Sequence, residues 1–392
     1  MSFLIVLAAL CFLMFVAYRG YSVILFAPIA ALGAVLLTDP SLVAPMFTGL
    51  FMDKMVGFLK LYFPVFLLGA LFGQLMADSG AATAISHWIM RVLGEKHAIL
   101  TVVLACAVLT YGGVSLFVVA FAIYPIAKSL FRAAHVPKRL IPPTIALGSF
   151  TFTMTALPGT PSIQNAIPIP YYGTIVFAAP GLGIIGGMTM LALGLWWLQS
   201  RAAKARVAGE GYGDHDDAVE QGLHDESDPA LHSRRDLPLL LALLPLVLVI
   251  AVNALLTYGV FPQMDFGFLK DRFPAVNPAK QTGLWALIMA LAVACAALVL
   301  LGLGRWRNLK ESVNKGVLGS MLPIFNTASE VGYGAVIASL AGFAIIREAV
   351  LNVAPHNPLI SEAVAMNVLA GITGSSSGGL SIALSTLGKD YL

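Results

Sequence analysis

Long apolar runs, separated by short polar stretches, dominate the chain. A helix needs about 20 mainly apolar residues to cross the hydrocarbon core of a membrane. Runs close to this length predict spanning helices at 2–18, 21–37, 57–77, 173–198, 237–258, 282–304 and 321–346. The pattern therefore predicts an all-α polytopic membrane protein.

Two further pairs of apolar runs are too short to span a membrane comfortably. The first pair, 98–110 and 114–127, is separated by Gly112-Gly113, and the second pair, 359–373 and 378–387, by the Ser/Gly stretch 374–379. Short runs joined by a small-residue break are typical of hairpins that enter the membrane and return to the same side. We therefore expect two re-entrant hairpins.

The segment 141–172 is apolar but contains six prolines. Proline removes a backbone donor and clashes with the preceding helical turn, so a continuous helix is not expected here. We expect a broken helix with an unwound centre.

A weak internal repeat relates the two halves of the chain. FPVF at 63–66 matches LPIF at 322–325, and YGGVSL at 111–116 matches SGGLSI at 377–382, with offsets of 259 and 266 residues. Both matches keep their order and their place within each half. The repeat predicts a first transmembrane unit at 1–198 and a second at 237–392, joined by a polar linker at 199–236.

Basic residues in the short loops predict the orientation. The segments 128–139 and 305–315 each carry four Lys or Arg, and the linker 199–236 has basic residues at both ends. The positive-inside rule assigns these three segments to the cytoplasm and the N-terminus to the outside, in a bacterial inner membrane. The first half then starts outside and the second inside, so the two repeats are inverted, as in many secondary transporters.

Composition excludes several classes of protein. The chain is 58% hydrophobic and only 11% charged, whereas soluble domains carry about 25% charged residues. The net charge is only +3 and the sequence has no block of basic residues, so we expect no nucleic-acid partner. The three cysteines form no CxxC pair, so we expect neither a disulfide framework nor a metal site.

The broken segment carries the strongest candidate chemistry. Its centre reads TALPGTPSIQNAIP at 155–168 and holds the candidate binding residues Thr160, Ser162, Gln164 and Asn165. Unwound backbone at membrane depth is tolerated where it is buried in protein or lines a watery cavity. The alternative is a proline-rich loop outside the membrane.

Further candidates lie at the two hairpin tips and on the predicted span 321–346. Glycines allow a backbone to approach a ligand closely, although small residues also serve tight helix packing. An ionisable residue inside a span, Glu330, is a candidate proton carrier or cation contact, unless it lies in a wet vestibule. The candidates are Gly112, Gly113 and Ser115 in the first tip, Ser375, Ser376, Ser377, Gly378 and Gly379 in the second, and Asn326, Thr327 and Glu330 in the span.

One pattern resembles an enzyme motif. The stretch GSSSG at 374–378 fits GxSxG, with Ser376 in the nucleophile position. A nucleophile elbow requires a preceding strand and a following helix, whereas apolar membrane segments flank this one. An intramembrane serine hydrolase is therefore a remote alternative, and we assign no catalytic residue.

Three stretches resemble the gluconate permease (GntP) family of the ion transporter superfamily: YGGVSLFVVAFAIYP, TFTMTALPGTPSIQNAIP and NTASEVGYGAVI. The resemblance covers essentially the whole chain. It implies a secondary transporter of small organic acid anions, usually by proton symport, that forms a homodimer. Gluconate-transporting members typically have a histidine-containing PHPGP-like stretch where this chain has ALPGTP, so it is more similar to the D-3-hydroxybutyrate branch.

The sequence thus predicts a proton-coupled symporter of a small carboxylate such as 3-hydroxybutyrate or gluconate, with no cofactor beyond the coupling ion. A sodium-coupled di- or tricarboxylate carrier of the same superfamily stays open as the alternative. The repeat offset places a partner of the broken segment at about 421–434, beyond Leu392. We therefore expect the second repeat to be incomplete in these 392 residues.

Overall fold

The computed structural model describes residues 2–114, 116–213, 237–274, 276–302, 306, 308–353, 357–373 and 375–389. Every regular element in these ranges is helical. This agrees with the predicted all-α class.

Up to Val207, the described residues form sixteen helical segments, several of only one turn. The long helices are α1, α2, α4, α7 and α12, and short segments connect them. Their bounds are α1 Ser2–Tyr18, α2 Val23–Thr38, η1 Pro40–Leu42, α3 Val43–Pro45, η2 Met46–Phe51, α4 Met52–Asp78, α5 Ala81–Leu93, η3 Glu95–His97, α6 Ala98–Tyr111, α7 Leu116–Ala133, η4 Lys138–Leu140, α8 Ile141–Ser149, α9 Phe152–Thr155, α10 Ile163–Ala166, α11 Ile169–Tyr172 and α12 Pro180–Val207.

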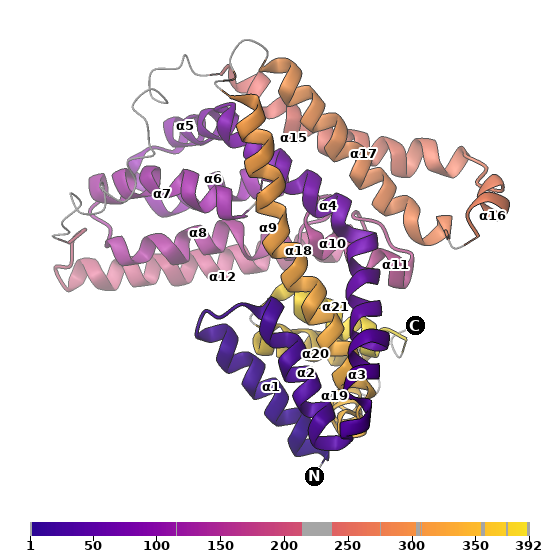
Figure 1. Cartoon of the computed structure of the whole chain (residues 1–392). Coiled ribbons are helices and arrows are strands. Elements are labelled where there is room, and N and C mark those ends of the chain that lie inside the picture. Colours follow the sequence, from indigo (N-terminus) through magenta and orange to yellow (C-terminus); the bar gives the residue numbers. More distant parts are fainter. Residues whose placement is uncertain are drawn as a thin grey trace.

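From Leu239 onward, the described residues form fewer and, on average, longer helical segments. Their bounds are α15 Leu239–Ala254, η5 Leu255–Val260, η6 Phe261–Gln263, α16 Phe268–Arg272, α17 Pro278–Leu301, α18 Leu309–Ser339, α19 Phe343–Leu351, α20 Pro358–Thr373 and α21 Ser376–Leu387. In Figure 1, α18 runs through the middle of the molecule and crosses α4. In that view α6, α7, α8 and α12 lie to its left, α15 and α17 to its upper right, and α1, α2 and α19–α21 below.

Within the described residues, four helical stretches are long and apolar enough to cross a membrane: Pro40–Asp78, Pro180–Val207, Leu239–Gln263 and Pro278–Leu301. The helices α1 and α2 are apolar but shorter, at 17 and 16 residues. Large apolar side chains on α12, such as Leu182 and Trp196, are exposed, as lipid-facing side chains would be. Several apolar spans in one chain agree with a multi-pass membrane protein.

One predicted span is wrong in its extent. Residues 321–346 were expected to form one helix, but α18 begins at Leu309 and ends at Ser339, and α19 then leaves at an angle of 95°. The turn approaches the start of α1 so closely that a Cβ on Gly342 would overlap the backbone of Ser2. Hydropathy alone does not reveal this bend, because both arms are apolar.

Two other boundaries also differ from the predictions. The residues between the predicted spans 21–37 and 57–77 are helical from Pro40, and the predicted linker 199–236 begins inside α12, which continues to Val207. Beyond α12, Glu210 forms an ion pair with Arg139 at 2.7 Å between Oε1 and Nε, which lowers the pKa of the Glu210 carboxyl. The remainder of the linker, 214–236, lies outside the described residues.

The helices α4 and α18 form the central crossing, and each carries an internal proline, Pro64 or Pro323. They run antiparallel, because Gly316 near the start of α18 lies against Leu71 near the end of α4. A Cβ on Gly316 would lie only 2.8 Å from the Leu71 Cα, so the glycine permits this close approach. The repeat itself stays a prediction, but the antiparallel crossing is what inverted halves require.

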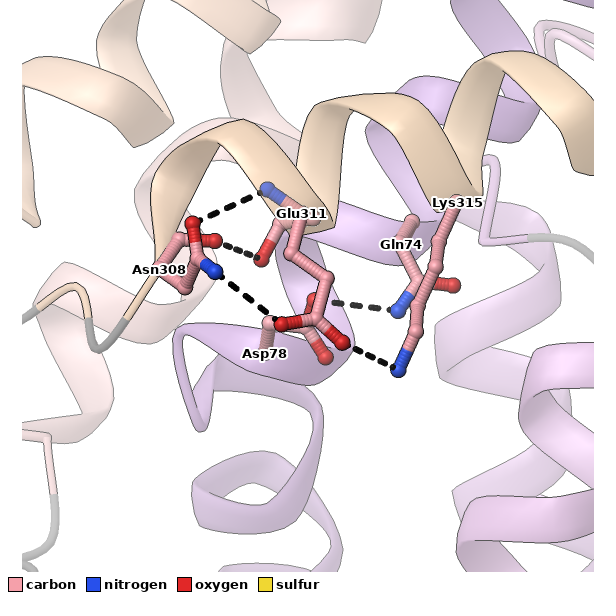
Figure 2. Close-up of polar contacts among 6 residues, drawn as sticks. Gln74, Asp78, Asn308, Glu311 and Lys315 are labelled. Carbon is pink, nitrogen blue, oxygen red and sulfur yellow. Dashed lines mark hydrogen bonds and ion pairs between the residues drawn. The ribbon is translucent and has the colours of Figure 1, made fainter.

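Polar side chains gather where α4 ends and α18 begins (Figure 2). On α4, the Gln74 amide donates to Asp78 at 3.0 Å. At the other helix, Asn308 caps α18 by accepting from the Glu311 backbone amide at 3.2 Å, and Lys315 lies 3.1 Å from Glu311 Oε1. This end of the helix pair therefore suits an aqueous boundary.

Each of the two expected hairpins corresponds to a pair of packed helices, and their re-entry into the membrane stays a prediction. The first is formed by α6 and α7, which pack together, and the second by α20 and α21. Between 141 and 172 the chain forms only the short helices α8–α11, as six prolines predict. The repeat predicted that Gly378 and Gly379 belong to the break between the two arms of the second hairpin. They lie instead in the first turn of α21.

Candidate functional site

The broken segment between α9 and α11 is held in place by side chains that donate hydrogen bonds to its backbone carbonyls. The Tyr62 hydroxyl of α4 donates to the Ile167 carbonyl at 2.8 Å, and the Tyr111 hydroxyl of α6 donates to the Pro158 carbonyl at 2.9 Å. The Asn165 amide donates to the Leu157 and Thr160 carbonyls at 3.2 and 3.4 Å. Irregular backbone is stable inside an apolar environment only when its polar groups are satisfied in this way.

The first hairpin tip contacts this segment. Gly113 has φ of +99°, a conformation that favours glycine, and a Cβ there would lie 2.6 Å from Pro161 Cγ. Its neighbour Gly112 packs against Leu246 of α15, so the helix-packing alternative explains Gly112. Ser115 lies outside the described residues.

The second hairpin tip meets the same segment from the other half of the chain. The Gln164 amide of α10 donates to the Ser376 hydroxyl of α21 at 2.8 Å. This contact joins residues 212 positions apart. The broken segment therefore lies between a tip from each half, as expected for a site assembled at a repeat interface.

The helix α18 supplies the buried face of the site. The Thr327 hydroxyl lies 3.2 Å from the Ser377 hydroxyl, and that group lies 3.3 Å from the Ser375 hydroxyl. Glu330, one turn further along α18, is only 2% exposed, and its Oε2 lies against Gly378, close to the Ser375 hydroxyl. The side chain is thus enclosed by protein in this structure, which favours a buried ionisable group over the wet-vestibule alternative. We call the connected set the polar cluster: Gln164, Thr327, Glu330, Ser375, Ser376 and Ser377.

Glycine at position 378 makes room for the Glu330 carboxyl. A Cβ at this position would overlap Oε2 of Glu330. Gly379 has a packing function, since its Cβ would overlap the backbone of Ala370 in the opposite arm of the hairpin. Thus only one of these two glycines faces the polar cluster.

Several buried oxygen atoms in this region have no hydrogen-bond partner among the described residues. They are Gln164 Oε1 and Glu330 Oε2 of the polar cluster, Thr160 Oγ1 of the broken segment, and Asn326 Oδ1 and Ser329 Oγ beside Thr327 and Glu330 on α18. Buried polar atoms are normally paired, so a concentration of unpaired ones marks a place where a ligand, ion or water completes the bonding.

The sequence predictions identified most of the polar cluster but missed its supports. Ser162 belongs to the broken segment, where its hydroxyl donates to the Met154 carbonyl at 2.8 Å, and its contact with a ligand stays a prediction. Tyr62 and Tyr111, which donate to carbonyls of the broken segment, were not among the candidates. A tyrosine inside an apolar span was a usable signal, because its buried hydroxyl needs a partner.

An apolar recess lies elsewhere, between the start of α5, the start of α15 and the end of α17. Its lining includes Leu237, Leu298 and Trp306, with Ser79 as its one hydroxyl. It shares no residue with the polar cluster. A lining without charged side chains is a poor environment for a polar ion, so the polar cluster is the better candidate.

An all-helical membrane protein with two hairpin tips on a broken, polar segment has the arrangement of a secondary transporter. Residues 3–313 match the GntP family permeases. The whole chain is similar to a protein of Bacillus subtilis (strain 168) named Uncharacterized transporter YxjC. The two are 47% identical over 409 aligned residues, covering 100% of this chain and 84% of the relative. The chain therefore belongs to the GntP permease family and is a membrane transporter, not an enzyme.

Membership in this family corrects the remote hydrolase alternative for Ser376. The structure agrees, since the partner of the Ser376 hydroxyl is the Gln164 amide, which donates to it, whereas a serine nucleophile donates its O–H to a base. The GSSSG stretch is thus explained by its position at the hairpin tip.

Proposed function

We propose that this permease is a proton-coupled symporter of a small organic acid anion, such as 3-hydroxybutyrate or gluconate. The observation that carries the proposal is the polar cluster, in which Glu330 is the one ionisable side chain. A carboxyl group enclosed by protein can change its charge by taking up and releasing a proton, which suits a proton carrier.

The anion is proposed to bind among the donors that surround Glu330. Hydroxyl groups of Ser376 and Ser377, together with the start of α21, offer hydrogen-bond donors to a carboxylate. The anion would enter the site at Ser376, which is exposed, and Glu330, which is buried, would form the inner end of the site. We further propose an inner-membrane homodimer with the linker 199–236 in the cytoplasm.

The sodium-coupled di- or tricarboxylate carrier is the competing hypothesis. The two are separated by uptake into proteoliposomes of purified protein, with an imposed pH gradient or an imposed sodium gradient. We expect accumulation of a labelled monocarboxylate with the pH gradient, inside alkaline, and none with sodium alone. Accumulation driven only by sodium would reject proton coupling.

Asn165 provides a separate test of the broken segment. Asn165→Ala leaves the Leu157 and Thr160 carbonyls without their amide donor, a loss of about 1–3 kcal/mol for buried groups. We expect uptake to fall at least tenfold while the protein still inserts and purifies as the wild type does. The matched control is Asn367→Ala, which removes an amide-to-carbonyl bond on the exposed face of α20. Wild-type uptake by Asn165→Ala would show that this bond does not shape the site.

A further inference from the structure

The Glu330 carboxyl lies at the N-terminus of α21. It occupies the position that a Cβ of Gly378 would take, next to the hydroxyl of Ser375, the residue that caps the helix. Its Oε2 has no partner among the described residues. A helix N-terminus carries a partial positive charge, so an ionised Glu330 neutralises it.

The same helix end has the donors that a substrate carboxylate needs. The first amides of a helix lack acceptors within the helix. In α21, Ser375 caps the Gly378 amide through its hydroxyl at 3.0 Å and the Gly379 amide through its carbonyl at 2.9 Å. The amides of Ser376 and Ser377 head the helix, beside their own hydroxyls. An external carboxylate at this end would therefore lie beside the Glu330 carboxyl.

Other charged groups around Glu330 are distant or exposed. The packed elements α2, η2, α10 and α21 contain no charged residue. Tyr62 donates to the Ile167 carbonyl, and Tyr333, one turn further along α18, packs in the core formed with α1 and α2; both side chains are uncharged at neutral pH. Glu362 lies about three turns from the hairpin tip along α20. The charged residues on the packed helices α4 and α19 near this level are Asp53, Lys54, Lys60, Arg347 and Glu348, and all are exposed.

We propose that Glu330 and the substrate carboxylate compete for the N-terminus of α21, and that this competition couples the proton to the anion. The inference rests on the proposed function. With Glu330 ionised, the helix end is neutralised and a second carboxylate is repelled. When Oε2 takes up one proton, the helix end is free to bind one carboxylate. One proton therefore enters with each monoanion, and the net charge of the site stays constant.

The coupling predicts how affinity depends on pH. For purified wild-type protein, the dissociation constant for D-3-hydroxybutyrate, measured by calorimetry, should rise about tenfold per pH unit once Glu330 is ionised in the free protein. Glu330→Gln keeps the shape of the protonated side chain, so its dissociation constant should equal the low-pH wild-type value at every pH. The control Glu362→Gln should keep the wild-type slope.

Wild-type protein alone provides a second measurement that needs no variant. Binding in weakly buffered solution at alkaline pH should take up one proton for each D-3-hydroxybutyrate bound. Binding by the wild type without proton uptake, an unchanged slope in Glu330→Gln, or loss of binding by that folded variant at all pH values would each overturn the inference. Proton-driven carboxylate uptake by the wild type alongside any of these results would leave the proposed function standing. Absence of proton-driven uptake of any carboxylate would reject both.

Discussion

Gly378→Ala is expected to abolish transport while the protein still folds. The added methyl group would overlap Oε2 of Glu330, and the carboxyl would have to leave the N-terminus of α21. The atom that moves is the end of a flexible side chain, so the backbone can stay in place. Initial uptake by proteoliposomes should fall at least tenfold, with an unchanged elution profile and melting temperature.

Two neighbouring glycines make this prediction specific. Gly379→Ala would place a methyl group against the Ala370 backbone, which should separate the hairpin arms and lower the melting temperature. Gly371→Ala, in α20, meets no atom within 4 Å and should retain both uptake and stability. Uptake by Gly378→Ala at the level of Gly371→Ala would contradict the close approach of α21 to Glu330.

Glu330→Gln is expected to separate accumulation from exchange. A glutamine cannot release a proton, so a pH gradient can no longer drive net uptake. Exchange of internal for external substrate requires no net proton movement and should continue. In proteoliposomes we expect no accumulation above the equilibrium level, with exchange at a measurable fraction of the wild-type rate.

The same assay shows whether the proton is carried elsewhere. If the Glu330→Gln variant still accumulates substrate under an imposed pH gradient, a group other than Glu330 carries the proton. The control Glu362→Gln changes a half-buried carboxyl in the other arm of the hairpin and should accumulate substrate as the wild type does.

Hydropathy and prolines predicted much of the fold, because membrane spans and helix breaks depend on local composition. The hairpin at Gly112-Gly113 and the broken segment at 141–172 are present at the expected positions. The bend after Ser339 was missed, because it depends on contact between Gly342 and the start of α1. Such contacts join residues far apart in the sequence and leave no local pattern.

The candidate site shows the same division. Polar residues in apolar surroundings, such as Gln164 and Glu330, were identified because burying them is costly. Which residue meets which partner depends on tertiary packing: nothing in the sequence links Gln164 to Ser376, or Tyr62 to the Ile167 carbonyl. The different functions of Gly378 and Gly379 likewise follow from the direction in which each Cα faces on α21.

Thiol labelling of Ser376→Cys tests most directly whether the hairpin tip and the broken segment form the substrate site. In a background with Cys11, Cys106 and Cys295 replaced by serine or alanine, the exposed Ser376→Cys should be alkylated readily. The account predicts that a transported carboxylate slows this alkylation, more strongly at low pH, and leaves the control Ser339→Cys unaffected. An equal rate of alkylation with and without saturating transported substrate would contradict it.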